Sequence, residues 1–222
     1  MKIQSLPIPG TDGALIPNTF YAQERPGCAH LALLFPGLHY TNAHPALYYT
    51  GLALRAAGAD VCAVDTRYAD PAFQALPDAE QMRRMAQDAE AAWRAAAAQR
   101  DYARITLVGK SLGTLALGHL LASQPALREA DFIWLTPLLR IDALFAQITT
   151  VPHRALFVIG DADPHYDPAR LAEAVRLTGG RSLVLPGAHH ALEIEGDAPA
   201  SVRLMEQIVE AVEEWLGQVK QA

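Results

Sequence analysis

The stretch RITLVGKSLGTLAL, residues 104–117, decides the fold. Residues 105–108 form an apolar run typical of a buried strand, and residues 112–122 form a longer apolar run typical of a buried helix. Gly109, Lys110 and Ser111 stand between the two runs. Two interpretations follow: the tripeptide ends a phosphate-binding loop, or Ser111 is a nucleophile held at a tight turn.

A phosphate-binding loop needs the pattern G-x-x-x-x-G-K-[ST], because a run of backbone amides has to wrap the phosphates between strand and helix. Here the first glycine would fall at position 104, which is Arg104. Residues 105–108 are the apolar strand itself, so the chain has no room for the loop. A nucleotide-binding function is therefore not expected.

The same residues fit the pattern G-x-S-x-G at Gly109, Ser111 and Gly113. A sharp turn from strand to helix would hold Ser111 in a strained backbone conformation with its hydroxyl exposed. Side chains in place of the two glycines would clash across the turn. The alternative is that Ser111 only caps the following helix, which does not explain both glycines.

Outside this stretch, short β-like runs alternate with longer helical ones. Strands are expected at residues 3–8, 14–21, 30–37, 59–66, 104–109, 132–136, 154–160 and 181–187. Helices are expected at residues 45–58, 78–100, 111–123, 167–178 and 201–219, with Asp78 and Gln81 spaced as a capping box. This alternation predicts an α/β fold in one domain, residues 1–222, with a mostly parallel sheet covered on both faces. Ligands then bind at the carboxyl ends of the strands.

The bulk composition excludes several classes of function. The chain has 222 residues, a formal net charge of −6 and a sequence pI near 5.7, so no basic surface for nucleic acid is expected. The most apolar stretch, residues 112–122, is too short to span a bilayer, and residues 1–10 do not resemble a signal peptide. Cys28 and Cys62 are expected to be free thiols. A cytoplasmic protein with a small-molecule substrate and no membrane partner is the expectation.

With its elbow-like turn and this order of segments, the chain resembles the α/β-hydrolase superfamily, specifically the small serine hydrolases with little or no lid. The resemblance extends from the strand at His30 to the last helix. It implies a central sheet of about eight strands, mostly parallel, with helices on both faces. It also implies that an oxyanion loop, the nucleophile, an acid and a histidine follow one another along the chain.

A serine nucleophile needs a base within hydrogen-bonding reach, and the base has to come from a later loop. The segment LPGAHHALE, residues 185–193, follows the last expected strand and offers His189 and His190. The G-x-x-H pattern frequent in the superfamily starts at Gly187 and selects His190, with His189 as the alternative. A zinc site at this pair lacks supporting cysteine or carboxylate spacing.

The acid that orients the histidine is expected in VIGDADPHYDP, residues 158–168. The superfamily pattern G-x-x-D, counted from Gly160, selects Asp163, with Asp161 as the alternative. Asp167 is more simply the N-cap of the next helix, with Pro168 at the first helical position.

The oxyanion hole needs two backbone amides. By resemblance these belong to Leu112, which follows the nucleophile, and to Leu38 in the loop FPGLHYTN, residues 35–42. The chain departs from the family because Pro36-Gly37 replaces the common His-Gly pair, so His39 and Tyr40 are alternative donors. His39, Tyr40 and Tyr68 either line the substrate pocket or are amphipathic rim residues. No chemical role is assigned to Lys110.

These residues predict a serine hydrolase in which Ser111, His190 and Asp163 form a triad and act through an acyl-enzyme. A carboxylic ester is the expected substrate, although a thioester or an amide would use the same groups. No metal or organic cofactor is required. Only about 17 residues (137–153) occupy the place where larger members carry a lid, so an open site is expected. A catalytically silent scaffold that binds a partner is the alternative.

Overall fold

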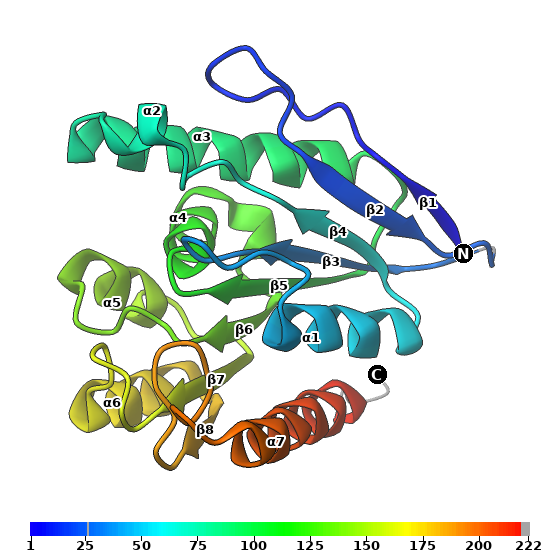
Figure 1. The fold of residues 1–222 in the computed structure, drawn as a ribbon. Coiled ribbons are helices and arrows are strands. Elements are labelled where there is room, and N and C mark those ends of the chain that lie inside the picture. Colours follow the sequence, from blue (N-terminus) through cyan, green and yellow to red (C-terminus); the bar gives the residue numbers. More distant parts are fainter. Residues whose placement is uncertain (26, 219–222) are drawn as a thin grey trace.

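The computed structural model describes residues 1–25 and 27–218, in which eight strands form one sheet (Figure 1). The strands are β1 (Lys2–Gln4), β2 (Asn18–Ala22), β3 (His30–Phe35), β4 (Asp60–Val64), β5 (Arg104–Lys110), β6 (Asp131–Leu135), β7 (Ala155–Gly160) and β8 (Arg181–Leu185). Their order in the sheet is β1-β2-β4-β3-β5-β6-β7-β8. The β1–β2 and β2–β4 pairs are antiparallel and the other five pairs are parallel. The expected α/β architecture is therefore confirmed.

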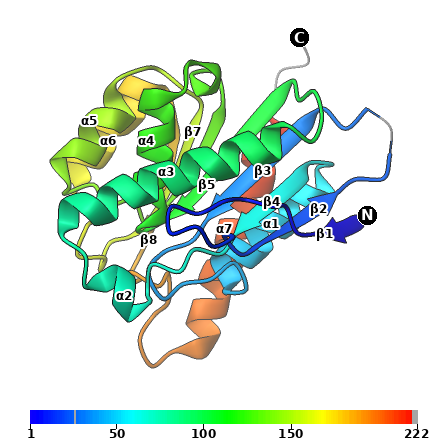
Figure 2. The same ribbon diagram turned by 90° about the horizontal axis from the view of Figure 1, so that it is seen from above.

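Helices cover both faces of the sheet. They are α1 (Pro45–Ala56), α2 (Pro71–Gln74), α3 (Asp78–Ala97), α4 (Gly113–Ser123), α5 (Asp142–Thr149), α6 (Pro168–Thr178) and α7 (Ala198–Gly217), with a 3-10 turn at Pro125–Leu127. Figures 1 and 2 show α1 and α7 on one face, and α3, α4, α5 and α6 on the other. Between β6 and β7 the chain adds only the short helix α5, so no lid covers the sheet edge.

Two hydrophobic layers follow from this arrangement, and β3 shows how one apolar strand serves both. Leu31, Leu33 and Phe35 pack into the layer under α3 to α6. Ala32 and Leu34 pack into the layer under α1 and α7. A strand buried on both faces needs apolar residues at successive positions, which explains the unbroken run that begins at His30.

The edges of several elements differ from expectation. The first two strands are shorter than expected, because Pro7, Pro9 and Pro17 have no amide hydrogen to donate to a ladder. The capping box is wrong: Pro77 occupies the N-cap of α3, and the side chain of Gln81 donates instead to backbone carbonyls of the preceding turn. The short helix α2 was not expected.

The last helix starts earlier than the hydrophobic pattern indicates. Asp197 is its N-cap, and the side chain accepts a hydrogen bond from Ala200 at 2.9 Å. Pro199 lies in the first turn, where a missing amide hydrogen costs nothing. Val219, the expected end of this helix, lies outside the described residues.

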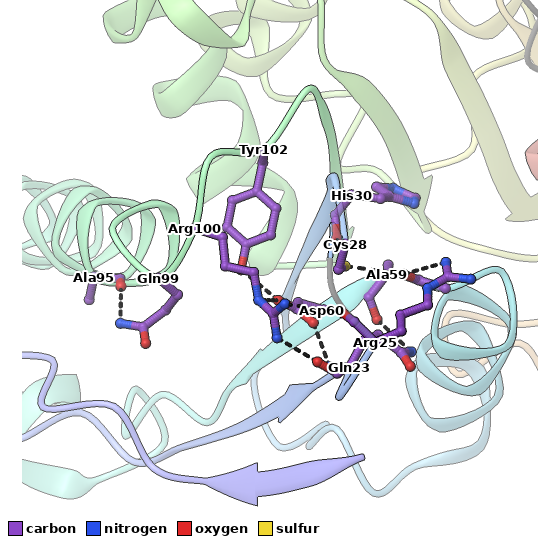
Figure 3. Close-up of polar contacts among 11 residues, drawn as sticks. Gln23, Arg25, Cys28, His30, Ala59, Asp60, Ala95, Gln99, Arg100 and Tyr102 are labelled. Atoms are coloured by element: carbon purple, nitrogen blue, oxygen red, sulfur yellow. Dashed lines mark hydrogen bonds and ion pairs between the residues drawn. The ribbon is translucent and has the colours of Figure 1, made fainter.

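A polar cluster holds the sheet together at the amino ends of the parallel strands (Figure 3). Asp60 begins β4 and is fully buried. Its carboxylate accepts hydrogen bonds from the Tyr102 hydroxyl at 2.7 Å and the Gln23 amide at 2.6 Å, and pairs with Arg100 at 2.9 Å. A buried carboxylate needs such partners to offset the loss of water. Cys28, in the same region, and Cys62 are buried free thiols, as expected.

Candidate active site

The turn from β5 to α4 holds Ser111 at the carboxyl edge of the sheet. Its backbone φ is 51°, in the left-handed region that residues with a side chain rarely occupy. A Cβ atom on Gly113 would lie 2.1 Å from the carbonyl oxygen of Phe35, and one on Gly109 would lie 2.7 Å from the carbonyl oxygen of Gly113. Both glycines are therefore required by the close packing of the turn, and the strained elbow predicted from the sequence is present.

Ser111 does not cap the following helix. Leu112 holds the N-cap position of α4, and no side chain caps this helix end. The Ser111 hydroxyl instead lies 2.7 Å from Nε2 of His190, which the chain delivers from 79 residues away. The side chain of Ser111 therefore faces the imidazole ring of His190 and does not cap α4.

His190 bridges Ser111 and Asp163. Its Nδ1 lies 2.7 Å from Oδ2 of Asp163, on the loop that follows β7. The carboxylate of Asp163 can only accept a hydrogen bond, so the ring proton of His190 sits on Nδ1. Nε2 is then free to accept the proton of the Ser111 hydroxyl. This is the tautomer and the order of groups that a serine nucleophile needs.

Asp163 is held in place as a buried carboxylate. The residue is 4% exposed, and its Oδ1 accepts a hydrogen bond from the His165 amide at 2.8 Å. Burial by itself raises the pKa of Asp163, but hydrogen bonds from His190 and from the His165 amide outweigh it and leave the pKa below its ordinary value. The group is therefore an anion at neutral pH and can face an imidazolium.

The alternative histidine has a local role in its own loop. Nδ1 of His189 accepts a hydrogen bond from the Ala191 amide at 3.0 Å, and the His189 amide donates to the carbonyl oxygen of Glu193. These bonds shape the turn that presents His190. Of the two adjacent histidines, only His190 has its ring against Ser111.

The two other aspartates of the acid loop have structural contacts. Oδ1 of Asp161 accepts a hydrogen bond from the Gly187 amide at 2.6 Å, which links the loops after β7 and β8. Asp167 caps α6 by accepting from the Ala169 and Arg170 amides, as its position before Pro168 predicts.

The expected oxyanion donors come from two loops that meet at Ser111. A Cβ atom on Gly37 would lie 3.1 Å from Cβ of Ser111, so the loop after β3 passes directly over the nucleophile. Among the hydrogen bonds of the described residues, the amides of Leu38 and Leu112 donate to no backbone carbonyl or side chain. Both amides are thus available to an anion, and Leu112 adds the positive end of the α4 dipole.

The three residues expected at the rim lie in different surroundings. His39 is exposed at a left-handed turn, with a φ of 57°. The Tyr40 hydroxyl accepts a hydrogen bond from the Ala46 amide at 3.0 Å, at the start of α1. Tyr68 is buried, and its hydroxyl donates to Asp88. Of the three, His39 is the exposed residue, and substrate contacts by His39 and Tyr40 stay predictions.

Sequence reasoning missed three polar residues around these groups. Nζ of Lys110 donates to the carbonyl oxygen of His190 at 2.8 Å and to Oγ1 of Thr136 at 3.0 Å. Burial lowers the pKa of Lys110 to about 8, against the attraction of two carboxylates. The ring of His165 lies 5.7 Å from that of His190, and burial lowers the pKa of His165. Of these three residues, only Lys110 stands out in the sequence, because a lysine is unusual at the end of an apolar strand.

An open cavity of about 640 Å³ adjoins the histidine loop. It begins at Glu193 and Ile194, three and four residues after His190, and extends to Pro45 at the start of α1 and Met205 of α7. Apolar side chains supply most of this lining, so the cavity suits an apolar group rather than an ion.

Nowhere in residues 1–25 and 27–218 do three or more His, Cys, Asp or Glu side chains gather in a way that could hold a metal ion. Over the same part of the chain, no helix is both long and apolar enough to cross a membrane.

Solved structures share this architecture across almost the whole chain. Est1E from Butyrivibrio proteoclasticus, solved with ferulic acid, has a TM-score of 0.71 at 12% identity, covering 95% of this chain and 97% of that one. The esterase Pf2001 from Pyrococcus furiosus has a TM-score of 0.71 at 13% identity, covering 98% and 92%. A serine hydrolase without a lid from Xanthomonas campestris has a TM-score of 0.68 at 18% identity, covering 100% and 97%.

Neither a family model nor a curated protein matches the sequence. At identities of 12–18% the structural likeness establishes the fold rather than the reaction. The chain therefore has the α/β-hydrolase fold without a lid.

Proposed function

We propose, on the premise of this lidless α/β-hydrolase fold, that the protein is a serine hydrolase that cleaves a carboxylic ester. One observation carries the proposal: the Ser111 hydroxyl lies 2.7 Å from Nε2 of His190, whose Nδ1 lies 2.7 Å from Asp163. A strained serine in line with a half-buried imidazole and a buried carboxylate is costly to maintain and has no role in packing. Nucleophilic catalysis accounts for all three features together.

In the proposed reaction, Oγ of Ser111 attacks the ester carbonyl while Nε2 of His190 takes the hydroxyl proton. Asp163 stabilises the imidazolium, and the amides of Leu38 and Leu112 hold the oxyanion of the tetrahedral intermediate. The intermediate expels the alcohol, which takes the proton from His190, and leaves an acyl group on Ser111. Water, deprotonated by His190, then attacks the acyl-enzyme and releases the acid.

The open edge of the sheet favours a modest or exposed ester. No lid covers the loops after β3, β5, β7 and β8, so a deep tunnel for a long acyl chain is not expected. The cavity of about 640 Å³ beside the histidine loop is lined by neither Ser111 nor His190, so we assign it no part of the substrate. Neighbours of the same fold include proteins described as esterases and as a dienelactone hydrolase, which supports ester chemistry as the first choice.

A panel of p-nitrophenyl esters of graded acyl length tests this function. We expect turnover that peaks at short or medium chains and that falls at least about 10³-fold in Ser111→Ala. Circular dichroism of the variant should match the wild type, because Ser111 contributes little to the core. Absence of turnover on every ester, by protein shown to be folded, would favour a catalytically silent scaffold.

A further inference from the structure

Lys110, the residue before Ser111, is among the largest fully buried side chains of the protein, with 1% of its surface exposed. It forms no ion pair within the part of the chain that the structure describes. Removing an ammonium group from water without a paired anion is expensive, and a methionine would fill the same space without that penalty. The contacts of Nζ indicate the role of this buried ammonium group.

Nζ connects loops that leave different strands at the same edge of the sheet. It donates to the carbonyl oxygen of His190 at 2.8 Å and to Oγ1 of Thr136 at 3.0 Å. It also lies 4.5 Å from the ring centroid of Tyr40, at cation–π distance. The loops after β8, β6 and β3 therefore converge on a side chain that belongs to the last residue of β5, next to the nucleophile.

The contact from Lys110 falls at the residue of the histidine loop that carries the imidazole. Residues 186–197 contain no helix or strand. Among the hydrogen bonds of the described residues, the His190 backbone makes only the one from Lys110. The bond to Asp163 orients the imidazole ring. Bonds of Gly187 and Ala188 to the loop after β7 hold the preceding residues, so Lys110 is the contact that acts on the backbone of His190 itself. Lys110 holds that backbone to β5, which ends one residue before Ser111.

The backbone conformation of Thr136 supports a specific role for its contact with Nζ of Lys110. It is a β-branched residue with a φ of 45°, a conformation that is strained for such a side chain. In this conformation its hydroxyl accepts from Nζ, while its amide donates to the carbonyl oxygen of Val158 at 2.7 Å. An ammonium has three hydrogens and a neutral amine has two, so both oxygen acceptors are served in either protonation state.

We propose that Lys110 is a positioning residue: by binding the carbonyl oxygen of His190, it fixes the reach of the imidazole to Ser111. The proposal rests on the function proposed above. Lys110 does not touch the reacting atoms, so its removal should change how often the base is aligned and not how the substrate is bound. A displacement of about 1 Å in such a group can cost on the order of 100-fold in rate.

The test compares Lys110→Met with a matched change at the other end of the same strand. Thr106 lies in β5, is fully buried, and its hydroxyl lies 2.8 Å from Nε2 of His30. Thr106→Val therefore also replaces a buried polar contact of β5 by an apolar one, far from the histidine loop. If Lys110→Met does not fold, Lys110→Gln, which keeps a shorter donor, replaces it.

For Lys110→Met we expect kcat to fall about 10- to 100-fold while KM changes less than about 3-fold. Amide hydrogen exchange in residues 186–197 should become faster, with the strands unchanged and the melting temperature not lowered. Thr106→Val should keep the wild-type kcat and the wild-type exchange of this loop, whatever it does to stability.

Wild-type exchange in the loop of Lys110→Met, or wild-type kcat despite faster exchange, would overturn the positioning role. So would the failure of both Lys110 variants to fold, which would make the side chain a structural one. The hydrogen-exchange measurement does not depend on turnover. It therefore judges the link to His190 even if Ser111→Ala shows that the proposed hydrolase reaction is wrong.

Discussion

The chemistry proposed for Ser111 depends on its neighbours, since a serine hydroxyl alone is a weak nucleophile at neutral pH. Its φ of 51° turns the side chain away from α4 and toward His190. A helix-capping serine would not need the left-handed conformation, and the N-cap of α4 is Leu112. The proposed function therefore predicts that residues close together in the sequence have very different effects on turnover.

The two adjacent histidines should differ strongly in their effect on turnover. Only His190 contacts Ser111, whereas His189 stabilises its own turn through Ala191. We expect His190→Ala to lower kcat by at least about 10³-fold, and His189→Ala to keep a large share of wild-type activity. Steady-state kinetics on the best ester of the panel measures both. The opposite ranking would identify His189 as the base.

Asp163→Asn should leave the fold intact and still remove most of the activity. The amide can donate to Nδ1 of His190, which favours the tautomer with the proton on Nε2, where it can no longer accept from Ser111. A loss on the order of 10⁴-fold in kcat is expected. Asp161→Asn, which alters a contact to Gly187 in the same loop, is the matched control. Equal losses in the two variants would argue against the assignment of Asp163.

At the scale of elements, the sequence predicts most of the architecture because hydrophobic periodicity is local. The apolar runs locate β3 to β8, and Gly109 and Gly113 locate the turn between β5 and α4. The capping box at Gln81 failed because the side chain found nearer carbonyl partners in the preceding turn. Element edges depend on such competition, which a local pattern does not contain.

Gly113→Ala tests the packing of the turn directly. The new Cβ would lie 2.1 Å from the carbonyl oxygen of Phe35, which belongs to a strand and has no freedom to move aside. We expect the free energy of unfolding to fall by about 1–3 kcal/mol or more. Gly217→Ala at the end of α7, where no atom lies within 4 Å of the new methyl group, should change it little. Urea titration compares the two, and similar midpoints would show that the turn is looser than described.

At the scale of the whole molecule, the sheet keeps its structural polar groups and its candidate site at opposite edges. Asp60 and its partners lie at the amino ends of the parallel strands (Figure 3), whereas Ser111, Asp163 and His190 lie at the carboxyl ends. Sequence patterns placed the second group from loop order and family spacing. They did not reveal Lys110 or His165, because those contacts exist only once distant loops converge.

Buried histidines should make stability fall in mild acid. Burial, aided by Arg104, lowers the pKa of His30 to about 3 from an ordinary value near 6.5, so the folded protein disfavours the charged ring. Its contribution is fully present above pH 6.5 and is lost as the pH falls toward 3, by up to about 1.4 kcal/mol per pH unit. Urea unfolding at pH 7.5, 6 and 5 should show this loss, with a flatter dependence in His30→Gln. Parallel curves for the two proteins would contradict it.

The most direct test of the central claim is covalent labelling with a fluorophosphonate, followed by peptide mass spectrometry. We expect one adduct per chain, on the oxygen of Ser111, with labelling abolished in Ser111→Ala and strongly slowed in His190→Ala. A folded wild-type protein that stays unlabelled, or that carries the adduct on another residue, would contradict the assignment of Ser111 as the nucleophile.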